Sequence, residues 1–172
     1  MAELRIEIPR IELGHLELTL IGDSPLISHR WSDKAKGMML AKQMKKAKPG
    51  KEAKDPDQDY RESLYEHPEG GFGFPCVAFK AASVGACRFS DGIKMTEARG
   101  AFHVVGELAK IEGDPSMRED MVRIDYNRAA LSAEQIVNLF NIAGFGVGVG
   151  EWRPEKDGSY GRFHVATQKD VP

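Results

Sequence analysis

Several features are scarce or missing in this sequence of 172 residues, and each absence excludes a class of protein. Only two cysteines are present, too few for the disulfide framework of a small secreted domain, which indicates a reducing setting. No apolar run approaches the roughly 18 to 20 residues that span a bilayer. The first residues also lack the apolar core of a secretory signal peptide. We therefore expect a cytoplasmic protein without a membrane segment.

Common motifs for nucleotide and metal sites are also absent. The glycine-rich stretch at 144–162 lacks Gly-Lys-Ser/Thr and follows an expected helix instead of opening one, so it is neither a P-loop nor a Rossmann turn. Cys76 and Cys87 have no Cys-x-x-Cys partner, and zinc would need two further ligands. The Asp-Pro-Asp-Gln-Asp stretch at 55–59 lacks the glycine that a calcium loop requires next, so we interpret it as a polar linker. We expect no metal and no cofactor.

The sequence has no large excess of either charge: 24 Lys and Arg residues against 26 Asp and Glu residues give a formal net charge of −2. That total alone argues against a nucleic-acid binder, but the charge is unevenly distributed. Residues 30–54 contain nine cations and two anions, so this segment carries +7 and the remainder of the chain carries −9. Phosphate backbones are the commonest partner for such a basic block. The alternative is a solvated segment whose lysines only keep it soluble.

The basic segment is expected to contain a helix. Ser32 can cap its start, and Pro49-Gly50 should end it. Its apolar residues form a ragged stripe typical of an adaptable core or interface, and they are Met38, Met39, Leu40 and Met44. A further short helical turn is expected at 59–65.

Alternating apolar residues predict strands, and two other patterns predict helices. The expected strands cover residues 4–8, 16–21, 101–105, 121–126 and 163–165. The small-residue stretch at 77–88 predicts one helix, and the glycines at 69–75 before it predict a loop. Ser132 and Gln135 form a capping box for a second helix that should end at Gly144.

The order of these elements predicts an α+β fold, because strands and helices interleave without the regular repeat of a doubly wound sheet. The simplest arrangement is a ferredoxin-like or RRM-like antiparallel sheet with helices on one face. We expect one domain over residues 1–172, with the basic segment inserted at about 30–58.

The glycine-rich stretch near the C-terminus combines cations with aromatic residues. Cations neutralise phosphates and aromatic rings stack on unpaired bases, and the residues concerned are Trp152, Arg153, Lys156, Tyr160 and Arg162. The alternative is a glycine-rich hairpin that turns at Asp157-Gly158, with Val147 and Val149 in the core.

Three stretches resemble the RAMP superfamily (repeat-associated mysterious proteins), which supplies backbone and repeat-processing subunits of CRISPR effector complexes. Residues 16–27 (Leu-Glu-Leu-Thr-Leu-Ile-Gly-Asp-Ser-Pro-Leu-Ile) resemble the family's first strand and the turn after it. Residues 74–82 (Phe-Pro-Cys-Val-Ala-Phe-Lys-Ala-Ala) resemble the start of its first helix. Residues 146–165 resemble its glycine-rich loop and last strand. The chain is most similar to the backbone subunits, which polymerise along single-stranded RNA.

The sequence departs from the family pattern at two places. Lys80 matches the family's lysine, but Cys76 and Ala78 replace its glycine and serine, which weakens a phosphate site at that helix start. Residues 120–131 are shorter than the family pattern, so the strand at 123–126 could join two fragments. The resemblance also extends to proteins encoded by phages and prophages, which implies a stand-alone binder in the host cytoplasm.

Together these features predict a protein, not an enzyme, that binds single-stranded RNA or DNA and self-assembles along it as a filament or ring. The residues expected to bind are His29, Arg30, Lys34, Lys36, Lys42, Lys45, Lys46, Lys48, Lys80, Trp152, Arg153, Lys156, Tyr160 and Arg162. One alternative is a phage structural or assembly protein that binds no nucleic acid. The other is a small metal-independent ribonuclease with His29 as its base, whereas His15, His103 and His164 lie on expected strands.

Overall fold

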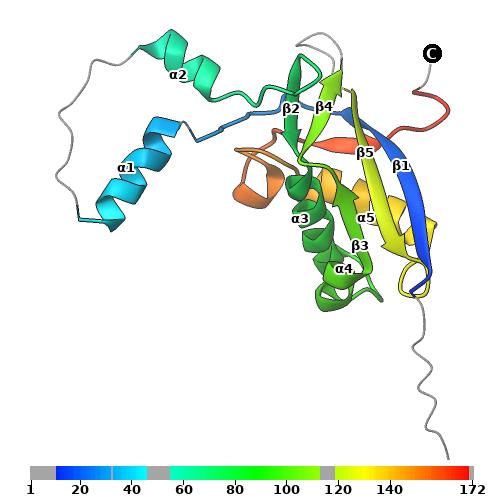
Figure 1. Ribbon diagram of the computed structural model, residues 1–172. Helices are drawn as coiled ribbons and strands as arrows, with labels where there is room; N and C mark the ends of the chain where they lie inside the picture. The colour runs from blue at the N-terminus through cyan, green and yellow to red at the C-terminus, as the bar shows by residue number, and fades with distance from the viewer. Residues whose placement is uncertain (1–10, 32, 46–54, 113–118, 171–172) are drawn as a thin grey trace, which may run out of the picture.

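The structure, a computed structural model, describes residues 11–31, 33–45, 55–112 and 119–170 (Figure 1). The strands are β1 (Leu13–Gly22), β2 (Phe72–Pro75), β3 (Phe102–Val105), β4 (Leu108–Glu112), β5 (Glu119–Asn127) and β6 (Phe163–Val165). The helices are α1 (Asp33–Gln43), α2 (Pro56–Glu62), α3 (Cys76–Ala86), α4 (Met95–Ala101) and α5 (Ala133–Gly146). Two short 3-10 turns, η1 (Cys87–Phe89) and η2 (Pro154–Lys156), complete the described elements.

The strands form one antiparallel sheet in the order β2-β4-β5-β1-β6, and β3 also pairs with β5. β3 and β4 lie along the same edge of β5, beside residues 123–126 and 119–120 respectively. They therefore act as one strand interrupted at residues 106–107. The body of the sheet thus has four strand positions, with the short β2 outside β4. The expected α+β class with an antiparallel sheet is confirmed.

Helices α3 and α5 cover one face of the sheet and build the core there (Figure 1). The apolar alternation of β1 turns Leu18 and Leu20 to this face, and that of β5 adds Val122 and Ile124, all buried. From α5, the buried side chains of Ile136, Leu139, Phe140 and Ala143 complete the layer. Burial of one such large apolar side chain stabilises the fold by about 1.5–3 kcal/mol, so this layer positions everything else.

Helices α5 and α3 lie where the sequence predicts them. At α5, the Ser132 hydroxyl accepts from the Gln135 amide and the Gln135 side chain accepts from the Ser132 amide, which is the capping box in full. The helix continues two residues past Gly144. α3 with η1 covers the expected 77–88, and the strands at 16–21, 121–126 and 163–165 are present within β1, β5 and β6. The strand expected at 101–105 is β3, which begins one residue later because Ala101 ends α4.

Other expectations were wrong. Residues 72–75 are a strand instead of a loop, because they pair with β4. β5 is one continuous strand paired with β1 over its whole length, and whether its sequence joins two fragments of a longer pattern stays a prediction. The polar linker at 55–59 is the start of α2, where the Asp55 carboxylate caps the amides of Asp57 and Gln58. α2 ends at Glu62, so the expected helical turn at 59–65 begins three residues earlier than foreseen.

The inserted segment holds α1 and α2, which stand beside the sheet layer instead of packing into it (Figure 1). α1 ends at Gln43, well before the expected stop at Pro49-Gly50. Its expected apolar stripe is not a packed face, because all four of its large apolar side chains are exposed. Ser32, Pro49-Gly50 and the expected strand at 4–8 lie outside the described residues.

The second face of the sheet is open and carries mixed charge. His15 on β1 and His103 on β3 flank Asp125 on β5 in register, and His15 Nδ1 lies 2.7 Å from Asp125 Oδ1. Glu17 and Arg123 form the next row. Among the strand residues whose side chains the structure describes, this face carries imidazoles but no Phe, Tyr or Trp ring, so it lacks the large apolar rings on which bases stack best. Within the described parts of the chain, no helix has the length and apolar character needed to cross a bilayer.

Candidate nucleic-acid interface

Residues 147–162, the glycine-rich loop, form a compact structure built from backbone hydrogen bonds. The amide of Val149 donates to the carbonyl of Gly161, and the amide of Tyr160 donates to that of Trp152. Two further bonds tie the loop to the segment after β1, from Glu151 to Ile27 and from Gly161 to Pro25. The loop doubles back on itself, as the alternative hairpin expected, but it contains no strand, and it turns through η2 instead of a two-residue turn at 157–158. Val147 and Val149 are buried, as that alternative expected.

The loop presents two exposed aromatic side chains. The Trp152 side chain is 65% exposed and that of Tyr160 is 41% exposed. Trp152 has a φ of 54°, in the left-handed region that residues other than glycine rarely occupy. Such a conformation costs on the order of 1–3 kcal/mol and persists only where the surroundings enforce it. The hydrogen bonds on both sides of Trp152 therefore hold an apolar ring out in solvent.

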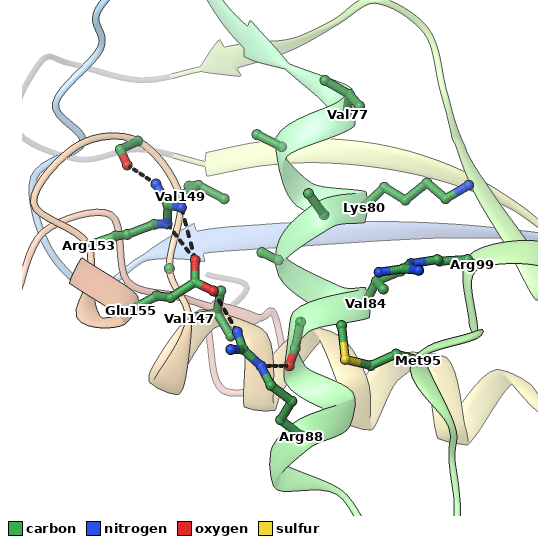
Figure 2. Close-up of a pocket in the computed structure, with 16 residues that line it drawn as sticks. Val77, Lys80, Val84, Arg88, Met95, Arg99, Val147, Val149, Arg153 and Glu155 are labelled. Carbon is green, nitrogen blue, oxygen red and sulfur yellow. Dashed lines mark hydrogen bonds and ion pairs between the residues drawn. The ribbon is translucent and has the colours of Figure 1, made fainter. Parts of the chain in front are cut away.

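A pocket of about 760 Å³ lies between this loop and α3 (Figure 2). Small and apolar residues of α3, among them Ala81, Val84 and Gly85, form its floor, together with Val147 and Val149 of the loop. Four cations stand around that floor against a single carboxylate, and these five residues are Lys80, Arg88, Arg99, Arg153 and Glu155. A cleft with an apolar floor and a cationic rim suits a ligand that has both flat apolar and anionic parts.

Glu155 links two of the arginines. Arg88 Nη2 donates to Glu155 Oε1 at 2.5 Å, and Arg153 donates to Oε2 from Nε at 3.2 Å and from Nη2 at 2.9 Å (Figure 2). The hydrogen bonds from Arg88 and then Arg153 hold the pKa of the Glu155 carboxyl below its ordinary value. Arg88 and Arg153 also donate to the carbonyls of Gly85 and Gly150. This network fixes the loop to α3.

Lys80 and Arg99 contribute the remaining positive charge of the pocket. Lys80 Nζ lies 3.0 Å from His103 Nδ1, so its neighbour is an imidazole nitrogen and not a carboxylate. Arg99 comes from α4 on the wall opposite the glycine-rich loop. Because neither cation is paired with a carboxylate in the described structure, both remain available to an anionic ligand.

The structure brings some of the expected binding residues together and separates others. Arg153 and Lys80 line the pocket, and Trp152, Tyr160 and Lys156 are exposed on the loop beside it. Arg162 is half-buried, its amide donates to the Ser24 hydroxyl, and its Nε is buried without a hydrogen-bond partner in the described structure. Arg162 therefore supports the junction with the end of β1 and does not line the pocket.

The expected residues of the basic segment form a second group. Lys36, Lys42 and Lys45 are exposed on α1 or directly after it, and only the backbone of Lys34 is described. Lys46 and Lys48 lie outside the described residues. His29 joins the two groups, because its Nδ1 lies 2.9 Å from Oε1 of Glu151 in the glycine-rich loop. The amide of Arg30 donates to the carbonyl of Ser63 after α2.

Sequence reasoning missed Arg88 and Arg99. Arg88 could have been found, because Lys80, Val84 and Arg88 recur at intervals of four and so share one face of the expected helix. Arg99 could not, because its position depends on α4, which no local signal announced. The two cysteines are buried, and burial raises the pKa of each thiol. The described residues contain no cluster of three or more side chains suited to hold a metal ion.

Comparison with known proteins gives no relative for this chain. It matches no protein-family model, no curated protein and no solved structure.

Proposed function

We propose that this protein binds single-stranded nucleic acid, RNA or DNA, in the cytoplasm and assembles along the strand. Phosphates meet the cations at the rim of the pocket, and bases stack on the rings of the glycine-rich loop. The lysines of α1 add long-range attraction for a polyanion. The open face of the sheet takes no part in this mode, because its described side chains are mixed in charge and include no Phe, Tyr or Trp ring.

The observation that carries the proposal is Trp152. Its side chain is 65% exposed and its backbone is held at a φ of 54°. Both features cost stability, and neither serves the core. A loop that maintains this cost beside a cationic pocket is what a stacking site for unpaired bases requires.

The order of the elements also supports a ferredoxin-like topology. With β3 and β4 taken as one strand, the order across the sheet is β6, β1, β5 and β3/β4. α5 directly follows the central strand β5, and α3 follows the central strand β1 once the inserted helices and β2 are left out. We propose on this basis that the chain is a ferredoxin-like variant, and that its resemblance to the RAMP superfamily reflects kinship.

The test is oligonucleotide binding by a Trp152→Ala variant. We expect labelled oligo(U) or oligo(dT) to bind the wild-type chain at low salt, and the variant to lose roughly ten- to a hundred-fold in affinity, because stacking contributes about 1–3 kcal/mol per base. Phe145→Ala is the control, since Phe145 is 77% exposed but lies on α5, outside the loop and outside the pocket. Absence of binding by the wild-type chain, or equal losses in both variants, would contradict the proposal.

A small ribonuclease remains the second candidate, and the pair between His29 and Glu151 favours it. A carboxylate oxygen 2.9 Å from Nδ1 orients an imidazole as a general base. Incubation with a labelled RNA, without added metal, tests this alternative. Cleavage that His29→Ala abolishes would support it, and RNA that stays intact with the wild-type chain would remove it.

A further inference from the structure

Four exposed large apolar side chains gather on α1 and the residue directly after it. The side chains of Met38, Met39, Leu40 and Met44 are each 47–59% exposed. α1 makes no extensive contact with the sheet, with α2 or with any other described element. A methionine-rich helix that is uncovered in one copy has the composition of an adaptable docking surface.

The charges of α1 and α2 are complementary. Residues 33–45 contain four lysines and one aspartate, whereas residues 55–62 contain four carboxylates and one arginine. α2 has no buried residue, and its Tyr60 is 67% exposed. In Figure 1 the two helices stand apart, so neither covers the other within the chain. α1 thus offers positive charge and α2 offers negative charge, and both have exposed apolar side chains.

A pocket beside α2 extends the acidic surface. It has a volume of about 550 Å³, and its lining has three carboxylates, from Asp59, Glu62 and Glu151, against one guanidinium and one imidazole, from Arg30 and His29. The imidazole of His29 already pairs with Glu151, and the exposed indole of Trp31 completes the apolar part of the lining. Ala35 of the same chain's α1 also lines it, so the first turn of α1 lies at the rim while the helix leads away from it (Figure 1). Indole and phenol rings beside carboxylates suit methionine and lysine side chains together.

We propose that α1 of one copy docks against α2 and this acidic pocket of a second copy. Lysines of the docked helix meet Asp59 and Glu62, and its methionines meet Trp31 and Tyr60. The contact rests on the self-assembly part of the proposed function and does not require nucleic acid. If α1 of each copy docks on α2 of the other, the product is a closed dimer. If each copy instead docks on a different neighbour, the product is an open chain.

Paired charge reversals test the proposal by analytical ultracentrifugation without nucleic acid. Lys42→Glu/Lys45→Glu and Asp59→Lys/Glu62→Lys should each weaken self-association at least ten-fold. A mixture of the two variants should restore it, because the reversed helix of one then fits the reversed surface of the other. Glu97→Lys on α4 is the control and should leave association unchanged. At a protein concentration low enough to keep the wild type monomeric, both variants should keep its unfolding temperature, because the reversed residues lie outside the core.

Disulfide trapping identifies the contact directly. One chain carrying Met39→Cys and another carrying Tyr60→Cys should give a mixed dimer on oxidation, since Cys76 and Cys87 are buried. A monomer at all concentrations, association only after an oligonucleotide is added, or cross-linking within one chain when both cysteines are present would overturn the proposal. If association is found but oligonucleotides do not bind, this inference stands while nucleic-acid binding fails.

Discussion

Glu155 shows how one carboxylate shapes the candidate site. By bridging Arg88 and Arg153 it holds η2 against α3, and it also neutralises much of the charge of those two arginines. The attraction for a phosphate therefore depends on Lys80 and Arg99, which have no carboxylate partner in the described structure. The same residue that gives the loop its shape limits how many of the four cations act on a ligand.

The lowered pKa of Glu155 predicts a pH-dependent contribution to stability. Because its folded pKa lies below the unfolded value of about 4.3, the ionised carboxylate stabilises the fold at neutral pH. This contribution is lost as the pH falls through the folded pKa. Glu155→Gln should thus lower the free energy of unfolding at pH 7 by at most about 1 kcal/mol, since the pair is partly exposed.

Thermal unfolding of wild type and Glu155→Gln from pH 7 down to pH 3 measures this effect. The two unfolding temperatures should converge toward the acid end. Glu97→Gln, on the exposed surface of α4, is the control and should follow the wild type throughout. A gap that stays constant with pH would mean that the variant changes packing and that the ion pairs contribute nothing.

At the scale of elements, the helices and strands that could be predicted from the sequence are those with a local sequence signal. The capping box at Ser132 fixes the start of α5 through contacts within four residues, and the alternation in β1 is long enough to identify a strand. β2 and β4 have no such signal, because β2 is defined by pairing with β4, and β4 by pairing with β2 and β5. α4 begins at Met95 without any side-chain cap. Elements that exist only through tertiary contacts could not be read from the chain.

Gly161 is the residue on which the shape of the glycine-rich loop depends. Its φ is +65°, and an added Cβ would overlap the carbonyl oxygen of Val149. Gly161→Ala should therefore cost about 2–4 kcal/mol of stability, from backbone strain and the clash together, and should weaken oligonucleotide binding by displacing Trp152. Gly70→Ala is the matched control, because Gly70 has a φ of +89° but open space around its Cβ position.

Chemical denaturation of both glycine variants separates the two causes. Gly70→Ala should show only the strain, about 1 kcal/mol, and should bind oligonucleotide as the wild type does. Equal losses in the two variants would show that the backbone conformation alone matters and that the close approach to Val149 does not.

At the scale of the whole molecule, the near-neutral charge conceals a polarised chain. The glycine-rich stretch was identifiable in advance because Trp152, Arg153, Lys156 and Tyr160 lie within nine residues of one another. The pocket was not, because it combines α3, α4 and the loop, which are distant in sequence. The basic segment was visible as charge, but its exposure on a projecting helix was not, since methionines at such spacing also occur in cores.

The salt dependence of oligonucleotide binding follows from this distribution. For single strands the logarithm of the binding constant falls with the logarithm of salt with a slope of about −0.7 for each phosphate neutralised. Lys80, Arg99 and Lys156 are cations at the site without a carboxylate partner in the described structure, so the expected slope is about −2. Arg99→Gln should reduce the magnitude of the slope by about 0.7, whereas Arg128→Gln, outside the pocket, should leave the slope unchanged.

A much steeper wild-type slope that returns to about −2 in Lys42→Gln/Lys45→Gln would assign phosphate contacts to α1 as well. A slope near zero would contradict a phosphate partner, because counterion release is unavoidable when such cations meet a polyanion.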